Sequence, residues 1–198
     1  MDWLFSTGGI PRGTLMEWIG ESPASGAGTL SLCLARGIPT TQRPAVVIDP
    51  EGEVYPMPLW VMGGDPSAWI FLRGRRALDS LWSLEQALRC EAVSLVWSVV
   101  PHLTPVAFRR LQLAVESSGT IGFLVRPPTA LGQPSWADVR LAVRPRPTKN
   151  ESPRFRIRAN SRRGQIRELC WDVELDASKG TLCKVDDSHE AQSMSLVS

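Results

Sequence analysis

The sequence predicts an α/β protein with a mostly parallel, twisted sheet flanked by helices and extended by antiparallel strands. Strand-length apolar segments alternate with segments of helical period from residue 15 to residue 125. Residues 93–100 are almost wholly apolar, as expected of a strand buried on both faces. After Pro127, strand-like segments follow one another without a helix between them. The alternation is typical of βαβ crossovers around a parallel sheet, and the change after Pro127 indicates antiparallel strands added to it.

The individual elements follow from apolar periodicity. The first five strands are predicted at 15–19, 45–48, 69–72, 93–100 and 120–125. Helices are predicted at 29–35, at 78–89 and at 105–117, the last opening with proline, a favoured first-turn residue. In the second helix Leu78, Leu81, Trp82 and Leu88 fall on one face, so we expect Trp82 to pack in the core, as we expect of Trp69 and Trp97.

The C-terminal strands are predicted at 139–143, 155–158 and 168–175, with a hairpin turn at Arg163-Gly164. From Asp176 onward the chain is polar, rich in Ser and Asp, and without period. We therefore expect one domain over residues 1–175 and a tail over 176–198 that is disordered or folds only on a partner.

Composition limits the function classes. No apolar run in the 198 residues reaches the roughly 18 that a membrane helix needs, and no leader is legible, so a cytoplasmic protein without membrane contact is expected. The four cysteines form no CxxC pair and there are only two histidines, so neither a metal site nor a Ser-His-Asp or Cys-His hydrolase centre is expected.

Charge is divided along the chain. Residues 140–167 hold nine Arg and one Lys against Glu151 alone, whereas residues 168–198 hold seven acids against two Lys. The block includes Arg154, Arg156, Arg158, Arg162, Arg163 and Arg167, of which the first three alternate on one face of a strand. Three roles stay open: binding nucleic acid phosphates, binding an acidic partner, or solvating an edge strand whose arginines neutralise the acidic end.

The segment from Gly20 to Thr29 joins the first strand to the first helix, where doubly wound folds hold phosphate. It contains Gly20, Ser25, Gly26, Ala27, Gly28 and Thr29, but it does not match the G-x-x-x-x-G-K-[ST] motif. Glu21 stands where the first glycine belongs and Ala27 where lysine belongs, and the first lysine of the chain is Lys149. Glu17 and Glu21 also add negative charge near the expected phosphate position. ATP binding in the ordinary manner is therefore not expected, and Thr29 is left with the role of a helix cap.

Several segments, in order, resemble the RecA ATPase core. They are 8–13 (GGIPRG) with 15–20 (LMEWIG), 48–52 (IDPEG), Gly64-Asp65, 93–105 ending in Leu-Thr-Pro, and 136–141 (WADVRL). Residues 81–89 (LWSLEQALR) and 109–114 (RRLQLA) make the chain similar to ImuA, the RecA-related accessory family of bacterial SOS mutagenesis. The resemblance implies a RecA-like core over residues 1–175 that lacks the N-terminal oligomerisation segment.

The resemblance also implies which working parts have been lost. Ala27 stands at the Walker A lysine, Ser98 at the Walker B carboxylate, and Glu51 is the one candidate water-activating base. Residues 127–135 correspond to the second DNA loop and contain no basic side chain. A pseudo-ATPase without cofactor is thus expected, acting as a non-catalytic adaptor in error-prone translesion synthesis.

The partners implied are an ImuB-type, Y-family-like polymerase subunit, and RecA and a replicative-type error-prone polymerase beside it, with weak DNA binding and recruitment to the nucleoid at damage. The alternatives are a divergent DNA-dependent ATPase or recombinase that uses Glu51, and a regulator of the SulA kind that inhibits a cell-division GTPase. The pattern leaves open the oligomeric state, residual nucleotide binding and which surface meets which partner.

Overall fold

A computed structural model of the chain describes residues 9–22, 24–40, 42–56, 59, 65–73, 77–148, 152–161 and 169–185. Within these ranges the strands form one sheet in the order β3-β2-β4-β5-β1-β6-β7-β8-β9. No helix in the described ranges is long and apolar enough to span a membrane. The strands are β1 (Leu15–Gly20), β2 (Ala45–Ile48), β3 (Trp69–Leu72), β4 (Leu95–Val99), β5 (Ile121–Arg126), β6 (Val139–Arg146), β7 (Arg154–Ser161), β8 (Leu169–Asp176) and β9 (Thr181–Lys184).

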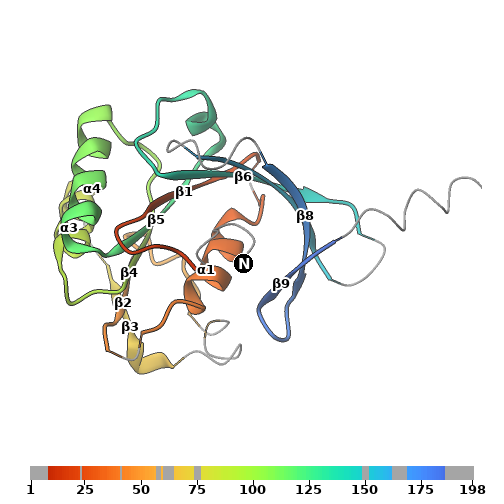
Figure 1. Ribbon diagram of the computed structural model, residues 1–198, viewed down its shortest axis with the longest axis horizontal. Helices are drawn as coiled ribbons and strands as arrows, with labels where there is room; N and C mark the ends of the chain where they lie inside the picture. Colours follow the sequence, from red (N-terminus) through yellow and green to blue (C-terminus); the bar gives the residue numbers. More distant parts are fainter. Residues whose placement is uncertain are drawn as a thin grey trace, which may run out of the picture.

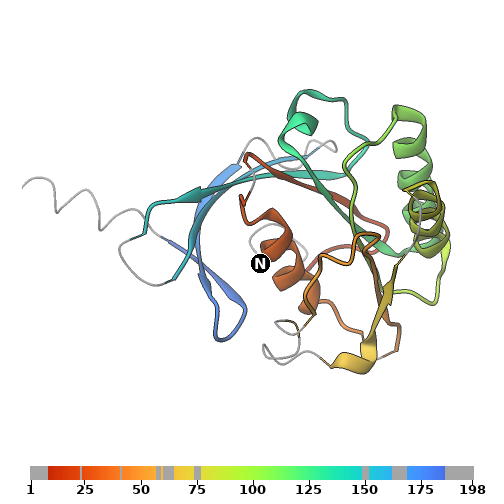
Figure 2. The same cartoon turned by 180° about the vertical axis from the view of Figure 1, so that it is seen from behind.

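The half of the sheet from β3 to β6 is parallel, as the alternation of elements predicts. Its helices are α1 (Ala27–Arg36), α3 (Ala77–Arg89) and α4 (Pro105–Ser118), with 3-10 turns η1 (Pro66–Ala68) and η2 (Pro128–Gly132). Helix α1 lies on one face of the sheet and α3 and α4 lie together on the other (Figures 1 and 2). The mixed α/β class expected from the sequence is confirmed.

Each face of the sheet has its own apolar core. Because side chains alternate along a strand, Trp18 of β1 packs with Leu30 of α1, whereas Leu15 packs with Leu84 of α3 and Phe108 of α4. The two clusters share the sheet as their common wall. Even-numbered residues of β1 therefore face α1, and odd-numbered residues face α3 and α4.

The half from β6 to β9 is antiparallel, which confirms the expected extension. It curves around α1, so that α1 lies between the parallel strands and β7–β9 (Figure 1). Phe155 and Ile157 of β7 and Val173 of β8 join the same apolar cluster as α1. The extension is therefore part of the core around α1.

The prediction that residues from 176 onward form no regular structure is wrong for 176–184. Asp176 accepts hydrogen bonds from the backbone N–H groups of Ser178 and Lys179, and Gly180 takes a left-handed φ of 61°. This turn reverses the chain so that β9 pairs with β8. The signal was an Asp followed by a turn glycine, the residues that such a turn requires. Residues 186–198 and the hairpin turn expected at Arg163-Gly164 lie outside the described residues.

The expectation that Trp82 is a core residue is also wrong, because its side chain is 64% exposed. Helix α3 packs on the sheet through Leu84 and Leu88, which are both buried. The expectations that Trp97 and Trp69 are core residues are confirmed, because these residues are 2% and 8% exposed.

Candidate functional site

The loop between β1 and α1 is the first candidate site. Strand β1 lies between β5 and β6 in the sheet, and Gly20 is its last residue. The loop therefore leaves the carboxyl end of an interior parallel strand and enters the N-terminus of a helix, the position at which α/β proteins hold anions. Whether this loop can bind an anion depends on which side chains occupy its interior.

The hydroxyl of Ser25 fills the interior of the loop. Ser25 is 5% exposed, and its Oγ lies so close to Gly20 that a Cβ built there would be 2.2 Å away. The same oxygen accepts a long hydrogen bond, 3.4 Å, from the backbone N–H of Ala27. The loop thus satisfies a donor at the start of α1 with its own side chain.

The ring of Phe155 lies against the backbone of Gly26. Gly26 is the N-cap of α1 with a left-handed φ of 81°, and a Cβ there would meet Phe155 Cε1 at 2.3 Å. Phe155 comes from β7 and is 7% exposed. A glycine is therefore required both by the backbone conformation and by the close approach of the ring. An apolar ring at this place offers no donor to a phosphate.

The residues that replace the motif lysine and hydroxyl cannot act in their place. Ala27 is 3% exposed and packs in the core around α1. Gly28, at the position of the motif Ser or Thr, has no hydroxyl for Mg²⁺. Thr29 is exposed in the first turn of α1, and the helix cap is Gly26, so the capping role expected for Thr29 is wrong.

A cavity of about 350 Å³ lies beside the first turn of α1. Leu32 and Cys33 of α1, Trp97 and Val99 of β4, and Glu53 and Val54 after β2 contribute to its lining. Among the described lining residues, Glu53 is the one that carries charge. Burial raises the pKa of the Cys33 thiol, an effect that Arg36 partly offsets, so Cys33 stays protonated and is a weak nucleophile. An apolar wall with a carboxylate disfavours a triphosphate.

Glu51 does not line this cavity. It is exposed in the turn after β2, whereas the buried Asp49 accepts hydrogen bonds from the backbone N–H groups of Glu53 and Val54, at 3.0 and 3.1 Å. The Asp49 carboxylate orders this turn and places Glu53, which the sequence interpretation missed, at the cavity. An Asp directly after a strand and before Pro-Glu-Gly was the available signal, since such residues favour turns.

The side chain of Ser98 does not face the β1–α1 loop. It is 3% exposed, and its hydroxyl donates to the backbone carbonyl of Ile48 on the neighbouring strand. The β4 residues beside α1 are Trp97 and Val99, and the Trp97 indole N–H donates to Ser31 Oγ at 2.8 Å. The position that the resemblance assigns to the Walker B carboxylate thus holds a hydroxyl that bonds to the neighbouring strand.

Glu17 lies on the sheet face opposite α1, so the expectation that it adds charge near a phosphate is wrong. It is 1% exposed and forms ion pairs with Arg126, at 3.6 Å, and Arg140, at 2.8 Å. Ser135 donates a hydrogen bond to it at 2.8 Å. Burial lowers the pKa of the Arg126 guanidinium, and the Glu17 carboxylate opposes that shift. The charge of Glu17 is compensated within the fold.

Arg126 and Arg140, the ion-pair partners of Glu17, also hold residues 127–135 in place. Arg140 donates to the carbonyl of Ala130 at 2.6 Å and to that of Gln133 at 3.2 Å. Arg126 donates to the side-chain oxygen of Gln133 at 2.9 Å. The segment that corresponds to a DNA loop in the resemblance is thus fastened to β5 and β6.

The arginine block is the second candidate site. Arg154, Arg156 and Arg158 share the face of β7 opposite Phe155, as the alternation predicts. Each has a carboxylate partner: Glu174 for Arg154, Asp172 for Arg156, and Glu21 for Arg158. The hydrogen bond from Arg156, together with the charges of Arg156, Arg146 and Arg144, holds the pKa of Asp172 below its ordinary value.

These contacts favour the third of the open roles, in which the arginines neutralise the acidic end of the chain. Arg154 faces Glu174 and Arg156 faces Asp172 across the β7–β8 ladder, which the sequence interpretation did not pair. Arg158 is exposed and Arg144 beside Arg156 is exposed as well, so part of the basic face remains open to solvent. Arg162, Arg163 and Arg167 lie outside the described residues.

Fold and loop together define a mixed α/β protein with a strand-loop-helix unit at the centre of its sheet and no lysine in that unit. Comparison with protein-family models and with curated proteins finds no match to the chain.

Proposed function

We propose that this protein is a non-catalytic, RecA-like adaptor of the ImuA family that acts in SOS-induced, error-prone translesion synthesis. The observation that carries the proposal is the filled loop: Ser25 occupies its interior and Phe155 packs on Gly26. A strand-loop-helix unit of the phosphate-binding type is retained as architecture while the groups needed to hold and split ATP are absent from it.

The arrangement of the resembling segments supports the RecA-like assignment. Residues 15–20 form β1, residues 93–105 lead through β4 into α4, and residues 136–141 lead into β6. The segment that corresponds to the second DNA loop lies directly before β6. These three segments thus contribute β1, β4 and β6 to one sheet.

The partners proposed are an ImuB-type, Y-family-like polymerase subunit, with RecA and a replicative-type error-prone polymerase at the same damaged DNA in the cytoplasmic nucleoid. Because three arginines of the basic face already have carboxylate partners, direct DNA binding contributes weakly. Protein contacts are then the main purpose of the fold.

Binding of the purified full chain to the ImuB-type subunit encoded in the same genome tests the adaptor. We expect saturable binding that is unchanged by Mg-ATP and by Glu51→Gln. Failure to bind that subunit, together with binding to the cell-division GTPase, would establish the SulA-like alternative. DNA-stimulated ATP turnover that Glu51→Gln abolishes would establish the ATPase alternative.

A further inference from the structure

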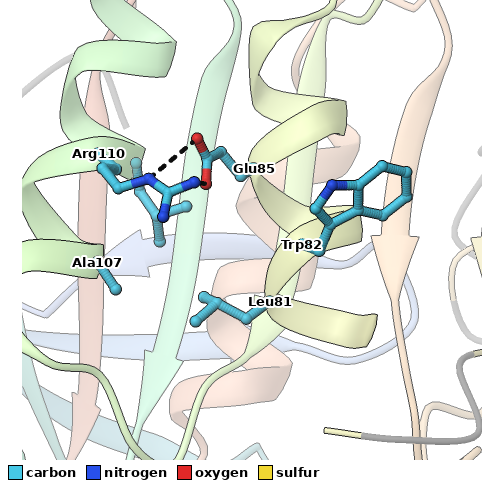
Figure 3. A pocket seen from close by; sticks show the side chains of 6 residues that line it. Leu81, Trp82, Glu85, Ala107 and Arg110 are labelled. Atoms are coloured by element: carbon cyan, nitrogen blue, oxygen red, sulfur yellow. Dashed lines mark hydrogen bonds and ion pairs between the residues drawn. The ribbon is translucent and has the colours of Figure 1, made fainter. Parts of the chain in front are cut away.

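Helices α3 and α4 leave a groove between them on the sheet face away from the loop. The groove has a volume of about 170 Å³, and it is lined by Leu81, Trp82 and Glu85 of α3 and by Ala107, Arg110 and Leu111 of α4. Leu81 and Ala107 face each other across it (Figure 3). The volume is close to the roughly 150 Å³ that accepts benzene in an engineered protein cavity, so it suits one aliphatic or aromatic side chain.

The two helices that form this groove carry exposed apolar side chains. Of the residues that line it, Leu111 is buried, whereas Trp82 is 64% exposed. On α4, Val106 is 73% and Leu113 is 44% exposed, and their spacing of seven residues places them on one side of that helix, together with Arg110. Exposed tryptophan and arginine side chains beside a pocket are the residue types that dominate binding energy in protein interfaces.

The rim of the groove is positively charged. Glu85 has a side chain only 8% exposed and pairs with both Arg89, at 2.9 Å, and Arg110, at 2.5 Å (Figure 3 shows the pair with Arg110). One buried carboxylate thus faces two guanidinium groups, whose side chains are 53% and 58% exposed. Each guanidinium has five N–H donors, so both have donors left for a ligand after pairing with Glu85.

We propose that the α3–α4 groove is a docking site for a segment of a partner protein that presents an apolar or aromatic anchor beside acidic residues. The anchor fills the space between Leu81 and Ala107, and the acidic groups pair with Arg89 and Arg110. Charge complementarity selects this occupant. A second copy of the chain would bring the same positive rim to the interface, and nucleic acid would place phosphates over an apolar floor. This proposal does not rest on the proposed adaptor function, because it is argued from the groove alone.

A random peptide library displayed on phage and selected on the full chain tests the groove. We expect the recovered peptides to combine an aromatic or aliphatic residue with Asp or Glu. A synthetic copy of the strongest peptide is then titrated by calorimetry. Trp82→Ala, and Arg110→Gln as a milder change that keeps a donor to Glu85, are expected to weaken its binding by about tenfold or more. The same loss is expected when its acidic residues are replaced by lysine.

Tyr55→Ala is the matched control, because Tyr55 is a similarly exposed aromatic, at 71%, that lies at the loop cavity on the other face of the sheet. It is expected to leave peptide binding unchanged. The proposal is overturned if no acidic peptide is enriched, if the recovered peptide binds Trp82→Ala and Arg110→Gln as it binds the unaltered chain, or if Trp82→Ala instead dissolves a dimer seen by sedimentation.

Discussion

At the scale of single residues, Gly26 and Phe155 determine how the β1–α1 loop packs. The glycine allows the chain to turn into α1 through a left-handed conformation, and it allows the ring to lie on the backbone. The two requirements coincide at one residue, whereas Gly28, two positions later, has only an ordinary contact at 4.0 Å to Trp97. The pair offers a direct comparison of a required glycine with a replaceable one.

Gly26→Ala is expected to reduce the free energy of unfolding by about 2 kcal/mol or more, because it adds left-handed strain to a steric conflict with Phe155. Gly28→Ala, inside the helix, is expected to be neutral or to raise the free energy of unfolding by up to about 1 kcal/mol. Urea denaturation of both variants measures the difference. Equal effects of the two substitutions would show that the Phe155 contact does not constrain the loop.

Asp172 gives the basic face a pH dependence. Its folded-state pKa is lowered, chiefly by the hydrogen bond from Arg156, so its stabilisation is present above the ordinary carboxyl pKa and is lost as pH falls through the lowered value. Asp172→Asn is therefore expected to destabilise the fold at pH 7, and the difference from the unaltered chain is expected to shrink below pH 3.8. Thermal unfolding over a pH series measures this. A difference that is constant with pH would contradict the pairing.

At the scale of elements, the β5–β1–β6 segment of the sheet depends on the buried ion cluster around Glu17. Its carboxylate lies between two guanidinium groups, and one of them, Arg140, also fastens η2 through backbone carbonyls. Breaking a buried pair by removing one partner leaves uncompensated charge in the interior, which costs more than the pair itself contributes.

Glu17→Gln is expected to lower the free energy of unfolding by about 3–5 kcal/mol, because Arg126 and Arg140 then lose their carboxylate. Glu91→Gln, at an exposed position after α3, serves as the control and is expected to change it by less than about 0.5 kcal/mol. Chemical denaturation compares them. If Glu17→Gln proved as mild as the control, the cluster would not stabilise the centre of the sheet.

Apolar periodicity predicted strands β1 to β8 and helices α1, α3 and α4, but it missed β9, and it did not show which face of α3 meets the sheet. The bounds of β2 and β3 coincide with the predicted segments, since both are short apolar runs. Trp82 was misplaced because its spacing of four residues groups it with Leu78, whereas the buried stripe of α3 runs through Leu84 and Leu88. A helical pattern with two possible apolar stripes does not say which one meets the sheet.

At the scale of the whole molecule, the site depends on contacts between distant parts of the chain. The alanine at position 27, where the motif has lysine, was visible in the sequence. The ring that packs on Gly26, however, belongs to Phe155 of β7, which is far from Gly26 in the sequence and two strands from β1 in the sheet. The carboxylate partners of the arginines depend on the β7–β8 register, which the block of like charge did not reveal. Local composition therefore predicted a loop without the motif lysine, but not the aromatic ring that packs on it.

Titration of the full chain with Mg-ATP in a calorimeter distinguishes a β1–α1 loop that is filled by its own side chains from one that binds phosphate. We expect no saturable heat at micromolar to millimolar nucleotide and no rise in melting temperature, whereas a bound ligand would stabilise the fold by mass action. Saturable micromolar binding of Mg-ATP, with turnover that Glu51→Gln abolishes, would contradict this expectation.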